Sequence, residues 1–176
     1  MAMAEEKCNR GEGKRTKDEV IGVAFAKLRP QRDDVFADIG CHSCKVSGFF
    51  SDYVRIVYAV DIDTENICKD FLRNKKNIVV LRAHGLEFLK ERGDEVDIVF
   101  FGGTRDIEEM IAMAAEKGVK KMCVSAARIE VAINAKRAMG KLFREIVAVN
   151  VWRSYELSGL TAFKPINPVF LVFGGI

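Results

Sequence analysis

Short apolar runs alternate with amphipathic segments along most of the chain. Five runs are apolar at nearly every position, as strands buried on both faces are, and they cover residues 34–40, 56–62, 78–81, 96–101 and 122–125. Apolar residues recur at helical spacing in residues 16–29, 63–73, 86–92, 105–117 and 129–142. This alternation predicts a mostly parallel sheet with helices on both faces.

The first helical segment carries its own start and stop signals. Thr16 and Glu19 have the spacing of a capping box, in which each side chain accepts a hydrogen bond from a backbone amide at the helix start. Pro30 cannot continue a helix and ends the pattern. We therefore expect Thr16 to cap a helix that stops before Pro30.

The C-terminal part follows a different pattern. Residues 146–151 and 169–173 form two apolar strands, and only a polar loop with Gly159 and Pro165 lies between them. Two strands joined without a crossover helix pair antiparallel. The expected fold is an α/β sheet of seven strands, mostly parallel, with an antiparallel strand pair at its C-terminal edge.

Composition narrows the class of protein further. The chain has 176 residues, of which 49% are hydrophobic, so we expect one folded domain over residues 1–176. Within it, residues 1–15 are a polar segment without an apolar signal sequence, expected to be flexible or to cover the site. No apolar stretch reaches the roughly 18 residues that a membrane helix requires. A net charge of +3 does not by itself indicate nucleic-acid binding, and five cysteines without framework spacing predict the reducing cytoplasm.

The turn after the first apolar run is the strongest candidate for a binding site. Ligands of α/β sheets bind beyond the carboxyl ends of the strands, often against a glycine-rich turn. Here the turn is residues 38–44 (DIGCHSC), and Asp61 follows 21 residues after Gly40, where a carboxylate can accept ribose hydroxyls. His42 and Cys44 stand where such a turn has its second and third glycines. A simpler role for Asp61 is to cap the following helix.

These residues, together with four longer motifs, identify a family resemblance. The chain resembles the CbiT-type decarboxylating methyltransferases of anaerobic cobalamin biosynthesis, also named precorrin decarboxylases, from residue 16 to residue 174. The generic part is Asp38-Ile39-Gly40-Cys41 with Ala59-Val60-Asp61. The specific motifs are residues 16–20 (TKDEV), 101–109 (FGGTRDIEE), 126–130 (AARIE), and 150–154 (NVWRS) followed by 167–169 (NPV).

The resemblance implies a fold, a cofactor and a reaction. The fold is the Rossmann-like sheet of class I methyltransferases, and the cofactor is S-adenosylmethionine. The reaction methylates carbon 15 of a cobalt-precorrin and removes the carboxyl group of the ring C acetate. No metal or nucleic acid is implied, and the family suggests a cytoplasmic homotetramer that does not bind membranes.

The resemblance also assigns cofactor-binding residues. Thr16 would lie over the cofactor, Asp61 would hold the ribose hydroxyls and Gly85 would flank the adenine. The methionine loop would consist of Gly40, Cys41, His42, Ser43 and Cys44. The family commonly has an acidic residue where this chain has His84. A side chain at position 42 or 44 could fill the volume that the methionine end of the cofactor needs.

Substrate-binding residues are expected to follow the strands on the same side of the sheet. A corrinoid carries many carboxylates, which arginines bind well. The candidates are Gly102, Gly103, Thr104, Arg105, Arg128 and Arg153, with Lys17 and Lys164 as further clamps. Glu130 and Arg128 are the candidate catalytic residues, with Glu130 as the proton donor or carboxyl-steering group. The glycines could instead only turn the chain, and the charged residues could be solvated.

Two other classes of function stay open. Cys41 and Cys44 form a C-x-x-C pair, which at a helix N-terminus would have lowered thiol pKa values and suit redox exchange or a metal site. The missing glycines also fit a protein that keeps the methyltransferase fold as a binding module without catalysis.

Overall fold

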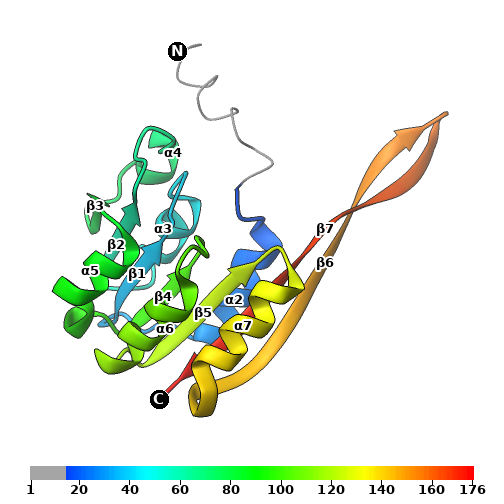
Figure 1. Cartoon of the computed structure of the whole chain (residues 1–176). Coiled ribbons are helices and arrows are strands. Elements are labelled where there is room, and N and C mark those ends of the chain that lie inside the picture. The colour runs from blue at the N-terminus through cyan, green and yellow to red at the C-terminus, as the bar shows by residue number, and fades with distance from the viewer. Residues whose placement is uncertain (1–14) are drawn as a thin grey trace.

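A seven-stranded sheet organises residues 15–176, the part of the chain that the computed structural model describes (Figure 1). The strand order is β3-β2-β1-β4-β5-β7-β6. The first five of these are parallel, whereas β7 pairs antiparallel with both β5 and β6. The strands are β1 (Val35–Ile39), β2 (Ile56–Asp61), β3 (Ile78–Arg82), β4 (Ile98–Phe101), β5 (Lys121–Ala126), β6 (Phe143–Leu157) and β7 (Leu160–Gly175). The predicted fold class is confirmed.

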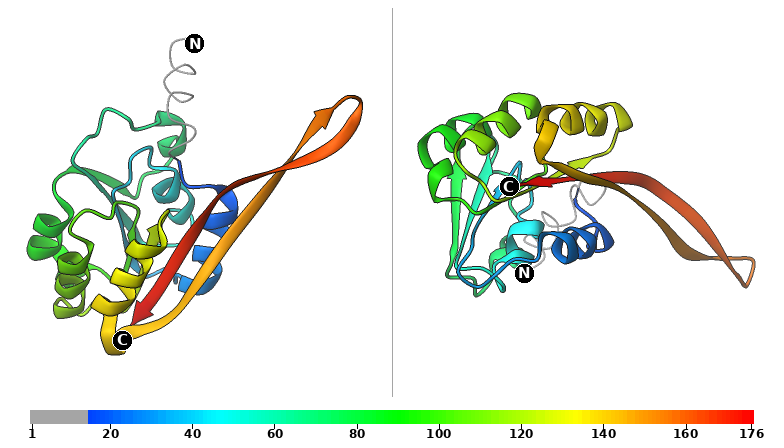
Figure 2. Two further views of the ribbon diagram at one scale, coloured as in Figure 1. Left: turned by 45° about the vertical axis from the view of Figure 1, so that its right-hand side comes forward. Right: turned by 90° about the horizontal axis from the view of Figure 1, so that it is seen from below.

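Helices cover both faces of this sheet (Figure 2). On one face lie α5 (Gly85–Arg92), α6 (Ile107–Glu116) and α7 (Ile129–Met139), and on the other lie α2 (Asp18–Leu28) and α3 (Lys45–Phe50). The short α4 (Lys69–Leu72) and two 3-10 turns, η2 (Gly93–Glu95) and η3 (Gly140–Leu142), complete the elements. Among residues 15–176, no helix is long and apolar enough to span a bilayer.

The apolar runs are continuous because each face of the sheet has its own core. In β1, Val35, Ala37 and Ile39 pack into the core under α5, α6 and α7. Phe36, between them, packs into the core under α2 and α3. Successive side chains of a strand point to opposite faces, so a strand buried on both faces is apolar throughout. Asp38 shares the face of Phe36 and is the one charged residue of the strand.

Two local expectations about helices are wrong, and one short helix was not predicted. The N-cap of α2 is Lys17 and no side chain bonds the first amides, so Thr16 and Glu19 do not form a capping box. Residues 63–68 are not helical, because the Asp63 carboxylate accepts hydrogen bonds from Glu65 N and Asn66 Nδ2 and holds a turn instead. The sequence pattern also missed α3, whose six residues are too few for a helical period to stand out.

The C-terminal strands are much longer than predicted. Strands β6 and β7 continue past the sheet as a two-stranded ribbon that projects from the body of the protein (Figures 1 and 2). Ser158 and Gly159 join them with positive φ values of 52° and 77°, as a two-residue type I′ hairpin turn requires. The predicted polar loop is therefore wrong, and Pro165 is a strand residue opposite Trp152.

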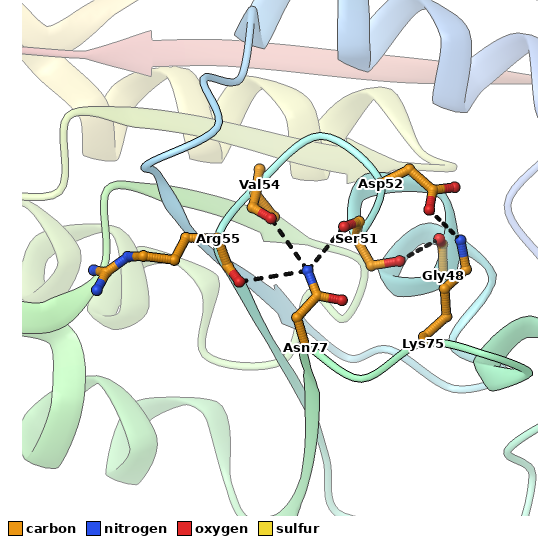
Figure 3. A network of polar contacts seen from close by, with 7 residues as sticks. All are labelled: Gly48, Ser51, Asp52, Val54, Arg55, Lys75 and Asn77. Carbon is orange, nitrogen blue, oxygen red and sulfur yellow. Dashed lines mark hydrogen bonds and ion pairs between the residues drawn. The ribbon is translucent and has the colours of Figure 1, made fainter.

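One polar clamp holds the start of β3 against the end of α3 (Figure 3). The side-chain amide of Asn77 donates to the carbonyl oxygens of Ser51, Val54 and Arg55, at 2.8, 3.1 and 3.4 Å. Its backbone carbonyl accepts a hydrogen bond from Val57 N. Asn77 thus satisfies carbonyl groups in the connection between α3 and β2 and fixes the start of β3 against it.

Candidate functional site

A cavity of about 390 Å³ opens beyond the carboxyl ends of β1, β2 and β4. This is the side of a parallel sheet on which ligands bind, and the volume is in the range of small-molecule sites. The residues that line it come from the segment before α2, the ends of β1, β2 and β4, the loops after β1, β2, β3 and β4, and the helices α3, α5 and α6. Most of the sequence-predicted site residues meet there: Thr16, Gly40, Cys41, His42, Ser43, Asp61, Gly85, Gly102, Gly103, Thr104 and Arg105.

The loop after β1 keeps the conformation of a glycine-rich turn with only the first of its three glycines. Gly40, His42 and Cys44 have φ values of 79°, 46° and 61°, so all three positions are left-handed. Histidine is one of the residue types enriched in this region, whereas cysteine is not. The Cys44 side chain is fully buried and does not line the cavity, so it occupies none of the ligand volume. His42 does line the cavity.

Asp61, at the end of β2, supports this loop. Its carboxylate accepts hydrogen bonds from His42 N at 2.8 Å and from Asp63 N at 3.0 Å. It does not cap a helix, because α4 begins only at Lys69 and its N-cap is Cys68. The carboxylate lies on the cavity wall, and an oxygen has room for more than one hydrogen bond.

Gly102 and Gly103 let the loop after β4 reach the loop after β1. Their amides both donate to the carbonyl of Ile39, at 2.8 and 3.1 Å. A Cβ on Gly102 would lie 2.9 Å from the Gly40 carbonyl oxygen, and one on Gly103 would lie 3.4 Å from the Gly40 Cα. Close contact between two backbones therefore accounts for these glycines, which the sequence analysis gave as candidate substrate-binding residues.

Asp38 is a cavity residue that was not among the predicted site residues. It is almost wholly buried, and its Oδ2 accepts hydrogen bonds from Ser47 N at 3.0 Å and Ser47 Oγ at 2.6 Å. Burial raises the pKa of this carboxyl group from its ordinary value of 3.8 to about 7, against the two hydrogen bonds from Ser47, which lower it. The sequence could have identified Asp38 as a site residue, because it is the one acid in an otherwise apolar strand.

Two basic residues that line the cavity were also not among the predicted site residues. Arg15 precedes α2, and its guanidinium lies 5.7 Å from the centre of the Phe71 ring. Lys45, the first residue of α3, forms an ion pair with Asp18 at 2.9 Å. The predicted clamp Lys17 instead donates to the Asn167 carbonyl and does not line the cavity.

His84 lines the cavity and makes one structural contact with each of its two ring nitrogens. As the N-cap of α5, its Nδ1 accepts a hydrogen bond from Leu86 N at 3.4 Å. Its Nε2 lies 3.3 Å from Asp106 Oδ2. The next residue, Gly85, is packed so tightly that a Cβ would clash with Ile39 and lie 2.7 Å from Met110 Sδ. His84 is thus held between α5 and the start of α6.

Besides Cys44 and Lys17, four further predicted residues lie outside the cavity. Arg128 is the N-cap of α7 and Glu130 lies in its first turn, both exposed. Arg153 is on β6 and pairs with Glu19 at 2.6 Å, and Lys164 lies 5.7 Å from the centre of the Tyr155 ring on the ribbon. Ala126, at the carboxyl end of β5, pairs with Phe170, so the ribbon leaves the sheet at the same edge as the cavity and extends beyond it.

The two cysteines of the C-x-x-C pair do not have the properties of a redox site. Their Sγ atoms are 3.6 Å apart and both side chains are buried. The hydrogen bond with Cys44, burial and the nearby carboxylates of Asp38 and Asp61 raise the pKa of the Cys41 thiol, whereas the redox interpretation predicted a lowered one. In the described part of the chain, no three His, Cys, Asp or Glu side chains gather in a way that could hold a metal ion.

Comparison with known proteins points to one family. A family model described as the precorrin methyltransferase domain matches residues 7–173. A probable cobalt-precorrin-6B C(15)-methyltransferase (decarboxylating) of Archaeoglobus fulgidus is 51% identical over 164 residues, which cover 92% of this chain and 98% of the relative.

Solved structures agree with this match. The precorrin 8W decarboxylase of Methanobacterium thermoautotrophicum superposes with a TM-score of 0.83 at 25% identity and 92% coverage of both chains. A precorrin-6y C5,15-methyltransferase of Geobacter metallireducens also has a TM-score of 0.83, at 26% identity, covering 94% of this chain and 93% of its own. The resemblance deduced from the sequence motifs is confirmed, and the chain belongs to the precorrin methyltransferase domain family.

Proposed function

We propose that this protein is an S-adenosylmethionine-dependent methyltransferase that acts on a cobalt-precorrin, methylating carbon 15 and removing the carboxyl group of the ring C acetate. The observation that carries the proposal is the cavity at the ends of β1, β2 and β4, with the Asp61 carboxylate beside a left-handed loop. The names of the relatives supply the substrate class and both half-reactions. The chain would work as a single domain, in the cytoplasm.

The cavity residues suit the parts of this cofactor. Asp61 would accept hydrogen bonds from the ribose hydroxyls, and the backbone of Gly85, which lines the cavity, would flank the adenine. The backbone of residues 40–44 would face the methionine end, and the basic residues Arg15 and Lys45, which also line the cavity, would be available for its carboxylate. When bound, the cofactor supplies the electrophilic methyl group.

The corrinoid would lie over the mouth of the cavity. Thr104 and Arg105, in the loop after β4, provide a hydroxyl and a guanidinium there for the substrate carboxylates. Arg128 and Arg153 are outside the cavity, so any contact they make would be with the periphery of the macrocycle. The role of the protein in both steps is to position the reacting carbon and exclude water, because the conjugated ring can itself accept the electrons that decarboxylation releases.

Titration calorimetry with S-adenosylhomocysteine, the demethylated cofactor, tests the site. We expect the wild-type protein to bind it and Asp61→Asn to bind about 100-fold more weakly, since hydrogen bonds to a charged acceptor contribute roughly 1.5–3 kcal/mol each. Asp63→Asn is the matched control, because this neighbour does not line the cavity, and it should bind like the wild type. Absence of heat with the wild type at millimolar ligand would refute the proposed cofactor.

We further propose that the ribbon joins copies of this chain into a homo-oligomer, as the family suggests. Opposite pairing places Trp152 (59% exposed) on one face with Pro165, and Leu157 (54%) with Leu160 (75%) on the other. A two-stranded ribbon is marginally stable alone in water, and apolar side chains on both of its faces favour burial against a partner. A second copy is the partner that the resemblance indicates.

Light scattering after size exclusion measures this association. We expect the wild type to elute as an oligomer and Leu160→Glu to shift it at least partly to the monomer, because an unpaired charge would enter the interface. Ile129→Glu, at an exposed apolar position on α7 (45%), should leave the mass unchanged. A monomeric wild type would rule out this role of the ribbon.

A further inference from the structure

The start of α2 lies against the wall of the cavity. Arg15 and Thr16, directly before the N-cap of the helix, line the cavity. In the first turn of the helix, Asp18 pairs with Lys45, another residue of the cavity wall, at 2.9 Å. The position of this turn therefore affects two separate segments of the wall.

The same turn is attached to the base of the ribbon. Helix α2 contacts both β6 and β7 (Figures 1 and 2). Nη2 of Arg153 on β6 lies 2.6 Å from Oε1 of Glu19, and Lys17 Nζ donates to the carbonyl of Asn167 on β7 at 3.4 Å. Both strand residues lie past the end of β5, where the ribbon leaves the sheet at the edge of the cavity. One helical turn thus contacts the cavity wall and both strands of the ribbon.

An irregularity in the ribbon faces this turn. The register of β6 against β7 shifts at Asn150, which lies opposite both Asn167 and Pro168. Two residues against one make a β-bulge, which interrupts the hydrogen-bond ladder, and proline has no amide hydrogen with which to continue it. The Asn167 carbonyl at this bulge is the one that accepts the hydrogen bond from Lys17.

The carboxylate of Glu19 depends on Arg153. Within residues 15–176, Oε2 of Glu19 is buried and has no hydrogen-bond partner, which leaves the contact of Oε1 with Arg153 to compensate the charge. A charge that has lost part of its contact with water is unfavourable unless it is paired. Loss or reversal of the Arg153 charge should therefore displace Glu19, and with it the first turn of α2.

We propose that Arg153 is a positioning residue for the cofactor site: from the base of the ribbon it fixes, through Glu19, the first turn of α2, and so the place of Arg15 and Thr16 in the cavity wall. The inference rests on the proposed function, since it deepens the cofactor site. It gives a role to an arginine that lies outside the cavity and that the sequence analysis assigned to substrate binding.

Charge reversal tests this role by calorimetry with S-adenosylhomocysteine. Arg153→Glu should bind the ligand about 3- to 10-fold more weakly, because two carboxylates would repel each other at the start of α2. Glu19→Arg should have a similar effect. The double variant Glu19→Arg with Arg153→Glu should recover most of the affinity, since it restores an ion pair. Arg153→Gln, which removes the charge without reversing it, should lie between wild type and Arg153→Glu and serves if the reversal prevents folding.

The ion pair at the other end of α2 supplies a matched control. Lys27, in the last turn, pairs with Glu145 of β6 at 2.8 Å. Their side chains are 43% and 44% exposed, against 51% for Arg153 and 36% for Glu19, and neither residue lines the cavity. Glu145→Lys thus reverses a comparable pair between the same helix and the same strand. It should lower the thermal unfolding temperature about as much as Arg153→Glu but leave the affinity for S-adenosylhomocysteine unchanged.

The outcomes separate this inference from the proposed function. If the wild type binds no S-adenosylhomocysteine, the proposed function fails and the inference fails with it. If the wild type binds, the inference alone is overturned when Arg153→Glu binds equally well, when Glu145→Lys weakens binding as much, or when the double variant regains no affinity. Leu160→Glu, which should separate the copies of the oligomer, should bind like the wild type. Equal weakening in that variant would trace the effect to assembly and overturn the link through Glu19.

Discussion

Replacing Gly40 with alanine is expected to destabilise the protein by about 2–5 kcal/mol. Gly40 has a φ of 79°, at which a side chain costs roughly 1–2 kcal/mol. An added Cβ would also clash with the backbone nitrogen of Gly103 and lie 2.7 Å from its Cα. Overpacking of this kind costs roughly 1–3 kcal/mol. The contact cannot relax by moving a flexible side chain, since both partners are backbone. Urea unfolding of the two proteins measures the difference.

Gly118 offers a matched control for this substitution. It follows α6 with nearly the same φ, 78°, but a Cβ there would have no atom within 4 Å. Gly118→Ala should therefore show only the conformational cost of about 1–2 kcal/mol. If the two alanine variants lost the same stability, the close contact between the loops after β1 and β4 would not have the importance that we assign to it.

The stability of the Asp38→Asn variant relative to the wild type is expected to rise with pH by about 4 kcal/mol. The wild-type carboxyl group has a pKa of about 7 in the folded protein against an ordinary value of 3.8. Between these values the native state holds a proton that the unfolded chain has released, so raising the pH favours unfolding. Asparagine does not titrate and keeps an acceptor for Ser47. The advantage of the variant should appear above pH 4 and level off above pH 7, in unfolding curves recorded at each pH.

Ser47→Ala provides the complementary variant. The hydroxyl and amide of Ser47 bond the Asp38 carboxylate and lower its pKa, so loss of the hydroxyl should raise that pKa further. The pH-dependent loss of stability should then extend to higher pH than in the wild type. Parallel stability profiles for Asp38→Asn and the wild type between pH 4 and 7 would contradict the assignment of a buried, protonated Asp38.

The parallel part of the fold could be predicted because its signal is regular. Each strand is apolar on both faces, so the alternation of apolar runs and helical segments is visible without knowledge of the tertiary structure. The ribbon could not be predicted in this way. Its exposed strands mix polar and apolar residues on both faces, and Gly159 and Pro165 suggested a loop, although Gly159 is a hairpin turn residue and Pro165 a strand residue.

The candidate site was partly predictable for a related reason. Residues directly after β1, β2 and β4 lie at one edge, since parallel strands share a direction, and that rule places Gly40, Asp61 and Arg105 in one cavity. The rule fails for Arg153 and Lys164, which lie on antiparallel strands and point out along the ribbon. Arg15 and Lys45 reach the cavity through tertiary packing, for which the sequence has no periodic signal, whereas Asp38 could have been identified as the one acid in an apolar strand.

The unusual turn after β1 is less of an obstacle to cofactor binding than its sequence suggests. The backbone reaches the left-handed conformation at all three positions, and Cys44 is buried away from the cavity. Of the two non-glycine residues at left-handed positions, His42 lines the cavity and Cys44 does not. The loss of glycines is thus a change in the chemistry of the cavity wall and leaves the path of the backbone intact.

The most direct test of the proposed function is a turnover measurement with mass detection. The protein is incubated under anaerobic conditions with S-adenosylmethionine and cobalt-precorrin-6B, the corrinoid in the names of its relatives, and the corrinoid mass is followed. The prediction is a gain of one methyl group and a loss of one carbon dioxide per ring, both slowed in Asp61→Asn and unaffected in Asp63→Asn. A corrinoid whose mass stays unchanged with wild-type protein that binds S-adenosylhomocysteine would contradict the proposed reaction and favour a binding module with the methyltransferase fold.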